Sequence, residues 1–226
     1  MNVRLEELFA SAPLYAILDT GVQPGPPWHT VLDALDALLG AGVRVVQYRH
    51  KEFFDRRHYH ECALLARRAA ERGACFFVND RADIAVLSGA RGVHLGQDDL
   101  PPEKARVVAG DNFYIGYSTH NLEQAARALR EPIDYLAIGP VFPTATKHNP
   151  DPVVGLDMVR QLRAMMADSS TPRIPLVAIG GITLENARAV MEAGADAVAV
   201  IRDLFDAPDA EARAKEFLKE LKSAKA

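Results

Sequence analysis

The feature that most constrains this chain is a regular alternation of short apolar runs with longer amphipathic stretches. Eight runs have the length and composition of buried strands: 14–18, 43–49, 75–79, 92–95, 113–117, 134–138, 176–179 and 197–201. A stretch of helical periodicity follows each run: 29–39, 55–72, 81–87, 102–109, 122–129, 156–166, 184–193 and 210–221. This alternation is typical of parallel βα units, and eight such units predict an α/β fold, the closed (βα)8 TIM barrel.

Small residues stand just before several predicted strands, where a helix would turn into the next strand. The segments are A-G-V-R-V at 41–45, A-R-G-V-H-L at 90–95 and A-G-A-D-A-V at 193–198, and glycine is the usual left-handed cap of a helix. The alternative is an open doubly wound sheet, which would place a glycine-rich phosphate turn after its first strand. Asp19, Thr20 and Gly21 lead instead into a proline-rich loop without G-x-G-x-x-G, which favours the barrel.

Length, composition and charge limit the class of protein. The 226 residues fit a single domain spanning 1–226, and 49% hydrophobic with 25% charged residues is ordinary for a globular protein. The net charge of −4 offers no basic surface, so we expect neither nucleic acid nor a membrane as partner. The chain has no apolar run of about 20 residues and no secretory signal, so we expect it in the cytoplasm. The oligomeric state stays open, a homo-oligomer included.

The two cysteines and the two long loops add further expectations. Cys62 falls in a predicted helix and Cys75 in a predicted strand, so we expect reduced core residues rather than a disulfide framework. The loops at 22–28 and 140–154 interrupt the even spacing of the units. Both follow the carboxyl ends of strands, which is where barrel enzymes build their active sites.

The second strand ends in the segment Q-Y-R-H-K at 47–51. Strand alternation places Gln47, Arg49 and Lys51 on one face. The plain interpretation is a solvated strand end. The functional one is an anion clamp, because arginine binds phosphate oxygens through two nitrogens and lysine adds a mobile charge.

Acidic and amide side chains follow the third and fourth strands. Asn79 and Asp80 end the third strand, and Asp98 and Asp99 follow the fourth within H-L-G-Q-D-D. Neighbouring strands would bring these oxygens together, and Mg2+ binds one or two protein carboxylates besides substrate oxygens and water. The alternatives are a helix cap for Asp80 and a solvated turn for Asp98 and Asp99.

Polar residues also follow the remaining strands. Ser118 and His120 in G-Y-S-T-H face the same way, and a hydrogen-bonding role is expected because no G-x-S-x-G elbow is present; His120 could equally be a packing residue. The segment G-P-V-F-P-T-A-T-K offers hydroxyls and one cation that suit either a phosphate-binding lid or a solvated turn: Thr144, Thr146 and Lys147. I-G-G-I-T at 179–183 fits a phosphate at a helix N-terminus or a packing glycine pair, and V-I-R-D at 200–203 completes that phosphate position.

The ordered set of these motifs resembles the thiamine-phosphate synthase family, from about Leu14 to the last helix. Membership implies joining a pyrimidine diphosphate to a thiazole phosphate, or its carboxylate, with release of pyrophosphate and with Mg2+ as cofactor. The resemblance implies that Gln47, Arg49, Lys51 and Asn79 hold the aminopyrimidine pyrophosphate and that Asp80 and Asp99 bind Mg2+.

The same resemblance assigns the rest of the site. Lys147 would complete the pyrophosphate clamp, and Ser118 would lie beside the pyrimidine, so that Lys51, Ser118 and Lys147 form the expected catalytic set. Thr144 and Thr146 match contacts of the thiazole phosphate, and Gly181 and Ile201 match phosphate-binding backbone positions.

One departure from the family pattern stands after the last strand. Arg202 occupies a position where the family commonly has serine, so it would be an extra phosphate-binding cation or pair with Asp203 or Asp206. Rival functions are a thiazole tautomerase relative, a sugar-phosphate epimerase barrel and a non-catalytic sensor of thiazole or thiamine phosphate. The clamp and the two acids favour the synthase over the tautomerase, and an epimerase would leave Gln47, Arg49 and Lys51 unexplained.

Overall fold

The computed structural model describes residues 4–22, 30–144, 151–168 and 173–224, and these form a closed barrel of eight parallel strands. Each strand pairs with the next, and β8 pairs with β1 to close the ring. The strands are β1 (Leu14–Asp19), β2 (Val45–Arg49), β3 (Cys75–Asn79), β4 (Gly92–Leu95), β5 (Tyr114–Thr119), β6 (Tyr135–Ile138), β7 (Leu176–Ile179) and β8 (Ala197–Val200). The predicted TIM barrel is therefore confirmed.

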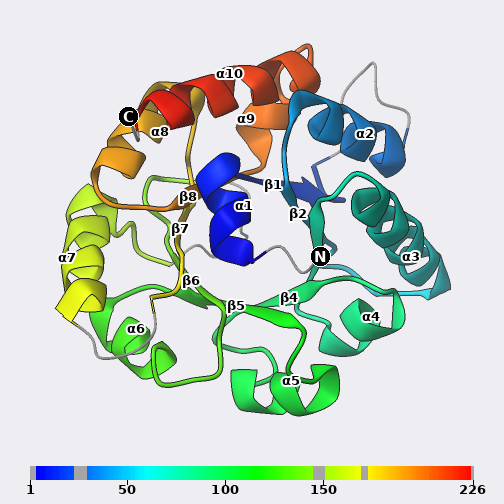
Figure 1. Ribbon diagram of the computed structural model, residues 1–226, viewed down its shortest axis with the longest axis horizontal. Coiled ribbons are helices and arrows are strands. Elements are labelled where there is room, and N and C mark those ends of the chain that lie inside the picture. Colours follow the sequence, from blue (N-terminus) through cyan, green and yellow to red (C-terminus); the bar gives the residue numbers. More distant parts are fainter. Residues whose placement is uncertain (1–3, 23–29, 145–150, 169–172, 225–226) are drawn as a thin grey trace.

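Helices surround the barrel on all sides (Figure 1). Those that follow the strands in the predicted order are α2 (Val31–Ala41), α3 (Arg56–Glu71), α4 (Ala82–Leu87), α5 (Pro102–Ala109), α6 (Leu122–Ala128), α7 (Gly155–Asp168), α8 (Leu184–Glu192) and α10 (Ala210–Ser223). Their bounds differ from the sequence expectation by a few residues at the ends. Within the described ranges, no helix combines the length and apolarity needed to cross a membrane.

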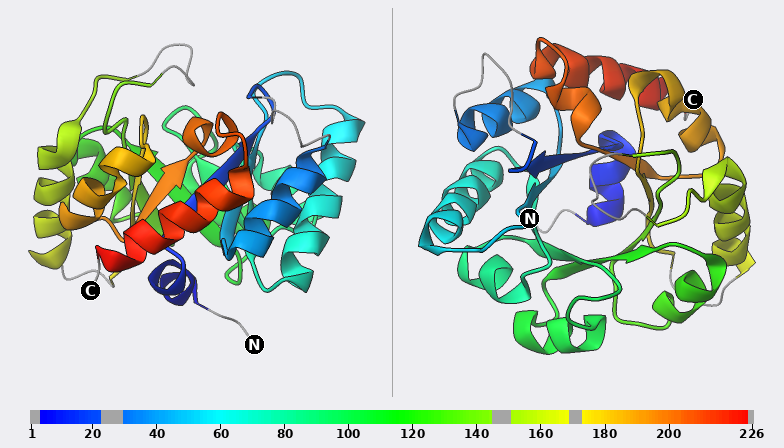
Figure 2. Two further views of the ribbon diagram at one scale, coloured as in Figure 1. Left: turned by 90° about the horizontal axis from the view of Figure 1, so that it is seen from above. Right: turned by 180° about the vertical axis from the view of Figure 1, so that it is seen from behind.

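Two short helices were not predicted. The first, α1 (Leu5–Ser11), lies in the middle of the ring of strands in Figure 1 and beyond one end of the barrel in the left view of Figure 2. It precedes β1 directly, so it covers the amino-terminal ends of the strands. The second, α9 (Arg202–Phe205), follows β8 at the opposite end. The N-cap residues of both helices form no side-chain cap hydrogen bond.

Buried apolar side chains form two separate clusters. The larger cluster fills the layer between the barrel and its helices and includes Cys62. The smaller cluster lies inside the barrel, where Leu5, Leu8 and Phe9 of α1 pack against inward-facing strand residues, Cys75 among them. Both cysteines are buried and free, as expected, and burial raises the pKa of each thiol to about 12.

Two glycines make room for the aromatic rings inside the barrel. A Cβ atom at Gly92 would stand 2.2 Å from the ring of Phe77, and one at Gly116 would stand 1.9 Å from the ring of Tyr135. Both distances are impossible for real atoms, so only glycine fits at these two strand positions. The rings of Tyr15, Phe77 and Tyr135 then meet edge to face or tilted, with centroids 5.6 to 5.8 Å apart.

Candidate active site

A cavity of about 710 Å³ opens at the carboxyl ends of the strands, the end opposite α1. It is lined by every predicted site residue that the structure describes: Gln47, Arg49, Lys51, Asn79, Asp80, Asp99, Ser118, Thr144, Gly181, Ile201 and Arg202. Thr146 and Lys147 lie outside the described residues. These residues come from seven strands, β2 to β8, or from the loops after them, and the carboxyl ends of the strands are where barrel enzymes build their sites.

Gln47, Arg49 and Lys51 share one face, as strand alternation predicted. Arg49 is not a solvated strand end: its guanidinium donates to Asp19, which stands opposite it on β1 and is only 6% exposed. This buried carboxylate holds the arginine in one orientation, because an unpaired charge at such a depth would be costly. The guanidinium still lines the cavity and has further donors to offer.

The Lys51 ammonium lies 2.6 Å from Asp80 Oδ2. Asp80 does not cap α4, whose N-cap residue is Arg81 without a side-chain cap bond, so the helix-cap interpretation is wrong. The backbone of Asp80 adopts a φ of 63°, the left-handed region that aspartate tolerates better than most residues. The Asp80 side chain lines the cavity.

Asp80 and Asp99 face one another. Burial raises the pKa of the Asp80 carboxyl to about 6, and the neighbouring Asp99 raises it further while Lys51 opposes the shift. Asp99 also accepts a hydrogen bond of 2.6 Å from the backbone nitrogen of Gly96, and this bond stabilises the turn after β4. Two carboxylates in mutual contact favour a cation between them, and the described part of the chain contains no cluster of three or more metal-binding side chains.

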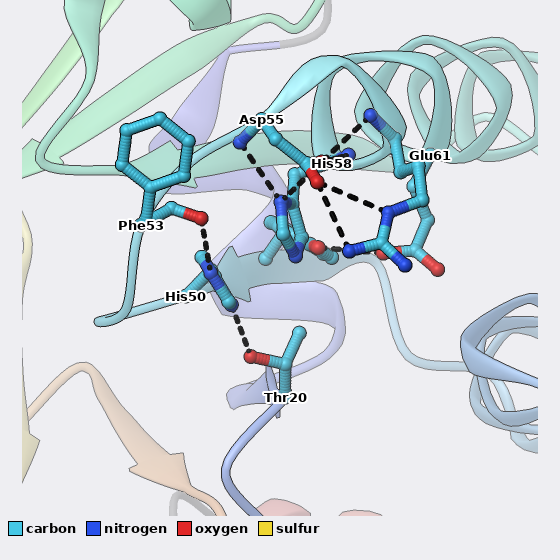
Figure 3. Close-up of polar contacts among 8 residues, drawn as sticks. Thr20, His50, Phe53, Asp55, His58 and Glu61 are labelled. Carbon is cyan, nitrogen blue, oxygen red and sulfur yellow. Dashed lines mark hydrogen bonds and ion pairs between the residues drawn. The ribbon is translucent and has the colours of Figure 1, made fainter.

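The loop that carries Lys51 is anchored on both sides by hydrogen bonds (Figure 3). The His50 ring donates from Nε2 to the Phe53 carbonyl at 3.2 Å and accepts at Nδ1 from the Thr20 hydroxyl at 2.7 Å. It also stacks on the His58 ring at 3.7 Å. Asp55 then begins α3 with a capping box. This network holds the loop beside the cavity, so Lys51 is positioned by a rigid support.

The described lining of the cavity carries more acid than base. Arg49, Lys51 and Arg202 provide three cations, while six carboxylates line the same space: Asp80, Asp98, Asp99, Asp151, Asp203 and Asp206. A cavity with this balance repels a diphosphate unless additional positive charge enters it. The arrangement therefore suits an anionic ligand that arrives with a divalent cation.

A chain of five hydrogen-bonded side chains crosses the barrel interior beneath the cavity. Gln47 Nε2 donates to Tyr15 Oη at 2.9 Å, and Tyr15 Oη lies 3.0 Å from Tyr135 Oη. Tyr135 Oη lies 2.6 Å from His94 Nδ1, and His94 Nε2 lies 2.8 Å from Ser118 Oγ. Burial lowers the pKa of His94 to about 4 and raises that of both tyrosines, so every member is neutral at neutral pH.

Asn79 has an unpartnered donor at the cavity wall. Its side-chain nitrogen is buried and finds no hydrogen-bond acceptor among the described residues. Leaving a buried donor unsatisfied costs about 1–3 kcal/mol. A ligand oxygen in the cavity would satisfy it, as expected for a residue that holds an anionic substrate.

The opposite wall is built from backbone and from the short helix α9. Gly180 and Gly181 have φ of 97° and 63°, and a Cβ atom at Gly181 would stand 2.4 Å from the Pro143 carbonyl oxygen. The glycine pair packs against the loop after β6, as one interpretation predicted, and it also lines the cavity, where phosphate binding stays a prediction. Arg202 lies at the rim, half exposed and 3.9 Å from Asp206, while Asp203 pairs with Arg213 instead.

His120 also lines the cavity, although its ring is engaged elsewhere. Its Nδ1 atom lies 2.6 Å from the Gly139 carbonyl oxygen and its Nε2 atom 3.4 Å from Asp151. The ring therefore connects the end of β5 to the loop after β6, which fits the packing interpretation.

Residues 14–204 match the family model described as thiamine monophosphate synthase. The chain belongs to this family. A thiamine-phosphate synthase from Koribacter versatilis is 47% identical over 93% of this chain and 96% of its own length, and one from Acidothermus cellulolyticus is 43% identical over 95% and 97%. A solved structure of thiamine phosphate pyrophosphorylase from Pyrococcus furiosus superposes with a TM-score of 0.83 at 33% identity, covering 97% of this chain and all of that one.

Four residues that build the site were not predicted from the sequence: Asp19, His94, Tyr15 and Tyr135. Asp19 was noted only as the start of a loop, although it ends β1 beside Arg49. His94 lies in the H-L-G-Q-D-D segment, and its place two residues after Gly92 puts it on the same face of β4 as that glycine, which faces the barrel interior. The tyrosines lie in apolar strands and look like ordinary core residues.

Proposed function

We propose that this chain transfers the methylpyrimidine group of 4-amino-2-methyl-5-pyrimidinylmethyl diphosphate to 4-methyl-5-(2-phosphoethyl)thiazole or its carboxylate. The products are thiamine phosphate and pyrophosphate. The observation that carries the proposal is the meeting of Arg49 and Lys51 with Asp80 and Asp99 at one cavity wall. Family membership and the names of the relatives support the same activity. We also propose that the barrel acts as one catalytic domain spanning residues 1–226.

Mg2+ fits the acid side of this cavity. Asp80 and Asp99 would hold it, since both carboxylates face the cavity and one another, and a diphosphate would supply further oxygen ligands. When bound, Mg2+ neutralises charge that develops on the leaving diphosphate. Lys51 lies against Asp80 and adds a mobile cation beside the same oxygens.

The side chains of the chain would act mainly by position and charge. Arg49 and Lys51 stabilise the diphosphate oxygens as the bond to the pyrimidine methylene carbon breaks, and Asn79 donates its unpartnered N–H to them. The thiazole nitrogen then forms the new bond to that carbon. No covalent enzyme intermediate is required, and binding both substrates in one cavity provides the orientation. The phosphate of the thiazole would lie at Thr144, Gly181 and Ile201, with Thr146 as a further expected contact, and Lys147 would complete the pyrophosphate clamp.

Incubation of the purified protein with both substrates and Mg2+ tests the proposal. We expect thiamine phosphate and pyrophosphate in equal amounts, detected by chromatography and by a pyrophosphate assay. Isomerised thiazole phosphate without pyrophosphate would identify a tautomerase. Tight binding of thiamine phosphate without turnover over several hours would identify a sensor. Either result contradicts the synthase.

A further inference from the structure

The buried chain from Gln47 to Ser118 contains one hydrogen for each link, and this sets its direction. Gln47 Nε2 donates to Tyr15 Oη, so the Tyr15 oxygen is an acceptor at that link. The single hydroxyl hydrogen of Tyr15 is then left for Tyr135 Oη, 3.0 Å away. The Tyr135 hydroxyl, already accepting from Tyr15, donates in turn to His94 Nδ1 at 2.6 Å.

The direction of these bonds determines the tautomer of His94. The ring is 7% exposed, and its hydrogen-bond partners among the described residues are hydroxyl groups rather than carboxylates, which favours a neutral imidazole. A neutral ring carries one N–H, and Nδ1 is occupied as an acceptor. The hydrogen therefore lies on Nε2, where it is donated to Ser118 Oγ at 2.8 Å.

Ser118 ends the chain at the cavity wall. Its oxygen accepts from His94, so its own hydrogen is available for another acceptor. No second partner of this hydroxyl occurs among the residues that the structure describes, and Ser118 lines the cavity. At the other end of the hydrogen-bonded series, the Gln47 side chain also lines the cavity.

We propose that this series of hydrogen bonds, from Gln47 through Tyr15 and Tyr135, fixes His94 as the Nε2–H tautomer. Ser118 thereby becomes a hydrogen-bond donor to an acceptor atom of the pyrimidine substrate. His94, Tyr135 and Tyr15 are positioning residues in this arrangement, because they act on the substrate through Ser118. The inference rests on the proposed function, since it takes the pyrimidine diphosphate as the ligand of the cavity.

Nitrogen NMR of the full-length protein, labelled on histidine, tests the tautomer directly. The protonated and unprotonated nitrogens of a neutral imidazole have distinct shifts. Comparison with the spectrum of His94→Asn assigns the His94 signals among those of the seven histidines. We expect the hydrogen on Nε2. A hydrogen on Nδ1 would mean that Ser118 donates to the ring, and it would overturn the proposal.

Tyr135→Phe tests the coupling without removing an aromatic ring. The variant loses the hydroxyl that donates to Nδ1, so we expect the Nε2–H form to lose its dominance. Tyr48→Phe is the matched control. Tyr48 is also fully buried, but its hydroxyl donates to Glu61 at 2.5 Å and takes no part in the hydrogen bonds that lead to His94. The control should leave the His94 signals unchanged. An unchanged tautomer in Tyr135→Phe would contradict the relay.

Steady-state kinetics connects the tautomer to the substrate. For Tyr135→Phe we expect KM for the pyrimidine diphosphate to rise about 3- to 10-fold, the effect of one neutral hydrogen bond, with KM for the thiazole phosphate unchanged. Equal changes for both substrates, or none, would refute the role of Ser118 as donor. The NMR measurement needs no turnover, so failure of the synthase assay and failure of this inference are separate results.

Discussion

The two ends of the barrel interior are built from different side chains. At the amino-terminal end, Leu5, Leu8 and Phe9 of α1 close the barrel with apolar groups that are at most 8% exposed. At the carboxyl end, a cavity of about 710 Å³ is lined by cations, carboxylates and amides. The amino-terminal end therefore contributes packing and stability, while the carboxyl end contains charged side chains that a bound ligand would neutralise.

Tyr15 and Tyr135 belong to both ends. Their rings pack in the apolar cluster beneath, with centroids 5.8 Å apart, and their hydroxyls form the middle of the polar chain above. The boundary between the two regions thus runs through single side chains. Substitutions at the amino-terminal end should therefore change stability, and substitutions at the rim of the cavity should change turnover. Substitutions of the two tyrosines should change both.

The largest expected effect is on stability, at the lower end. Phe9 is 1% exposed, so Phe9→Ala should lower the free energy of unfolding by about 3 kcal/mol or more, with kcat unchanged well below Tm. Urea denaturation measures the change. Phe53→Ala is the control, because Phe53 is 86% exposed, and it should stay within about 0.5 kcal/mol of the wild type. A fall in kcat for Phe9→Ala would show that the two ends are not separate.

Next in size is the loss of a proposed magnesium ligand. Asp99→Ala should lower kcat about 100-fold and raise the Mg2+ concentration needed for half-maximal rate, with little change in Tm. Titration of Mg2+ in the pyrophosphate assay measures both. Asp98→Ala removes the exposed neighbouring carboxylate and should keep the wild-type Mg2+ dependence. Full activity in Asp99→Ala would count against the metal assignment.

Lys51→Met should have an intermediate effect that is confined to one substrate. We expect kcat/KM for the pyrimidine diphosphate to fall about 30-fold, because a charge-assisted contact is lost, while KM for the thiazole phosphate stays near its original value. Lys104→Met is the control, since Lys104 lies on α5 and pairs with Glu103. Equal losses for both substrates would contradict separate binding regions.

The smallest effect should come from the half-exposed rim. Arg202→Ser should raise KM for the thiazole phosphate about 3-fold, because solvent and Asp206 screen the guanidinium. Arg188→Ser is the control: it removes an exposed arginine of α8 that pairs with Glu220 of α10, and it should leave the kinetics unchanged. Identical kinetics for Arg202→Ser and the wild type would remove this residue from the proposed clamp.

The fold was predictable because its signal is local and repeated. Each strand carries a short apolar run, each of the eight predicted helices has its own periodicity, and the count of eight leaves the barrel as the simplest closure. The helix α1 was not predictable in this way. It has seven residues and no side-chain cap, and its place depends on packing against a barrel floor assembled from distant strands.

The site was predictable only where polar residues interrupt the ends of apolar strands. Gln47, Arg49 and Asn79 stand out for that reason, and all three line the cavity. Tyr15 and Tyr135 are 120 residues apart and lie in apolar strands, so the local sequence does not indicate that their hydroxyls are in contact. The partnership of Arg49 with Asp19 likewise depends on strand register, which the sequence pattern does not specify.

The two glycines inside the barrel have a consequence for anyone who wishes to alter this enzyme. The Tyr135 ring packs directly against the backbone of Gly116, and the Phe77 ring packs in the same way against Gly92. A methyl group added at Gly116 would displace the Tyr135 ring. Its hydroxyl would then move relative to His94, and His94 in turn contacts Ser118 at the cavity wall. In a library of random variants, Gly92 and Gly116 should therefore be among the positions that tolerate the least change.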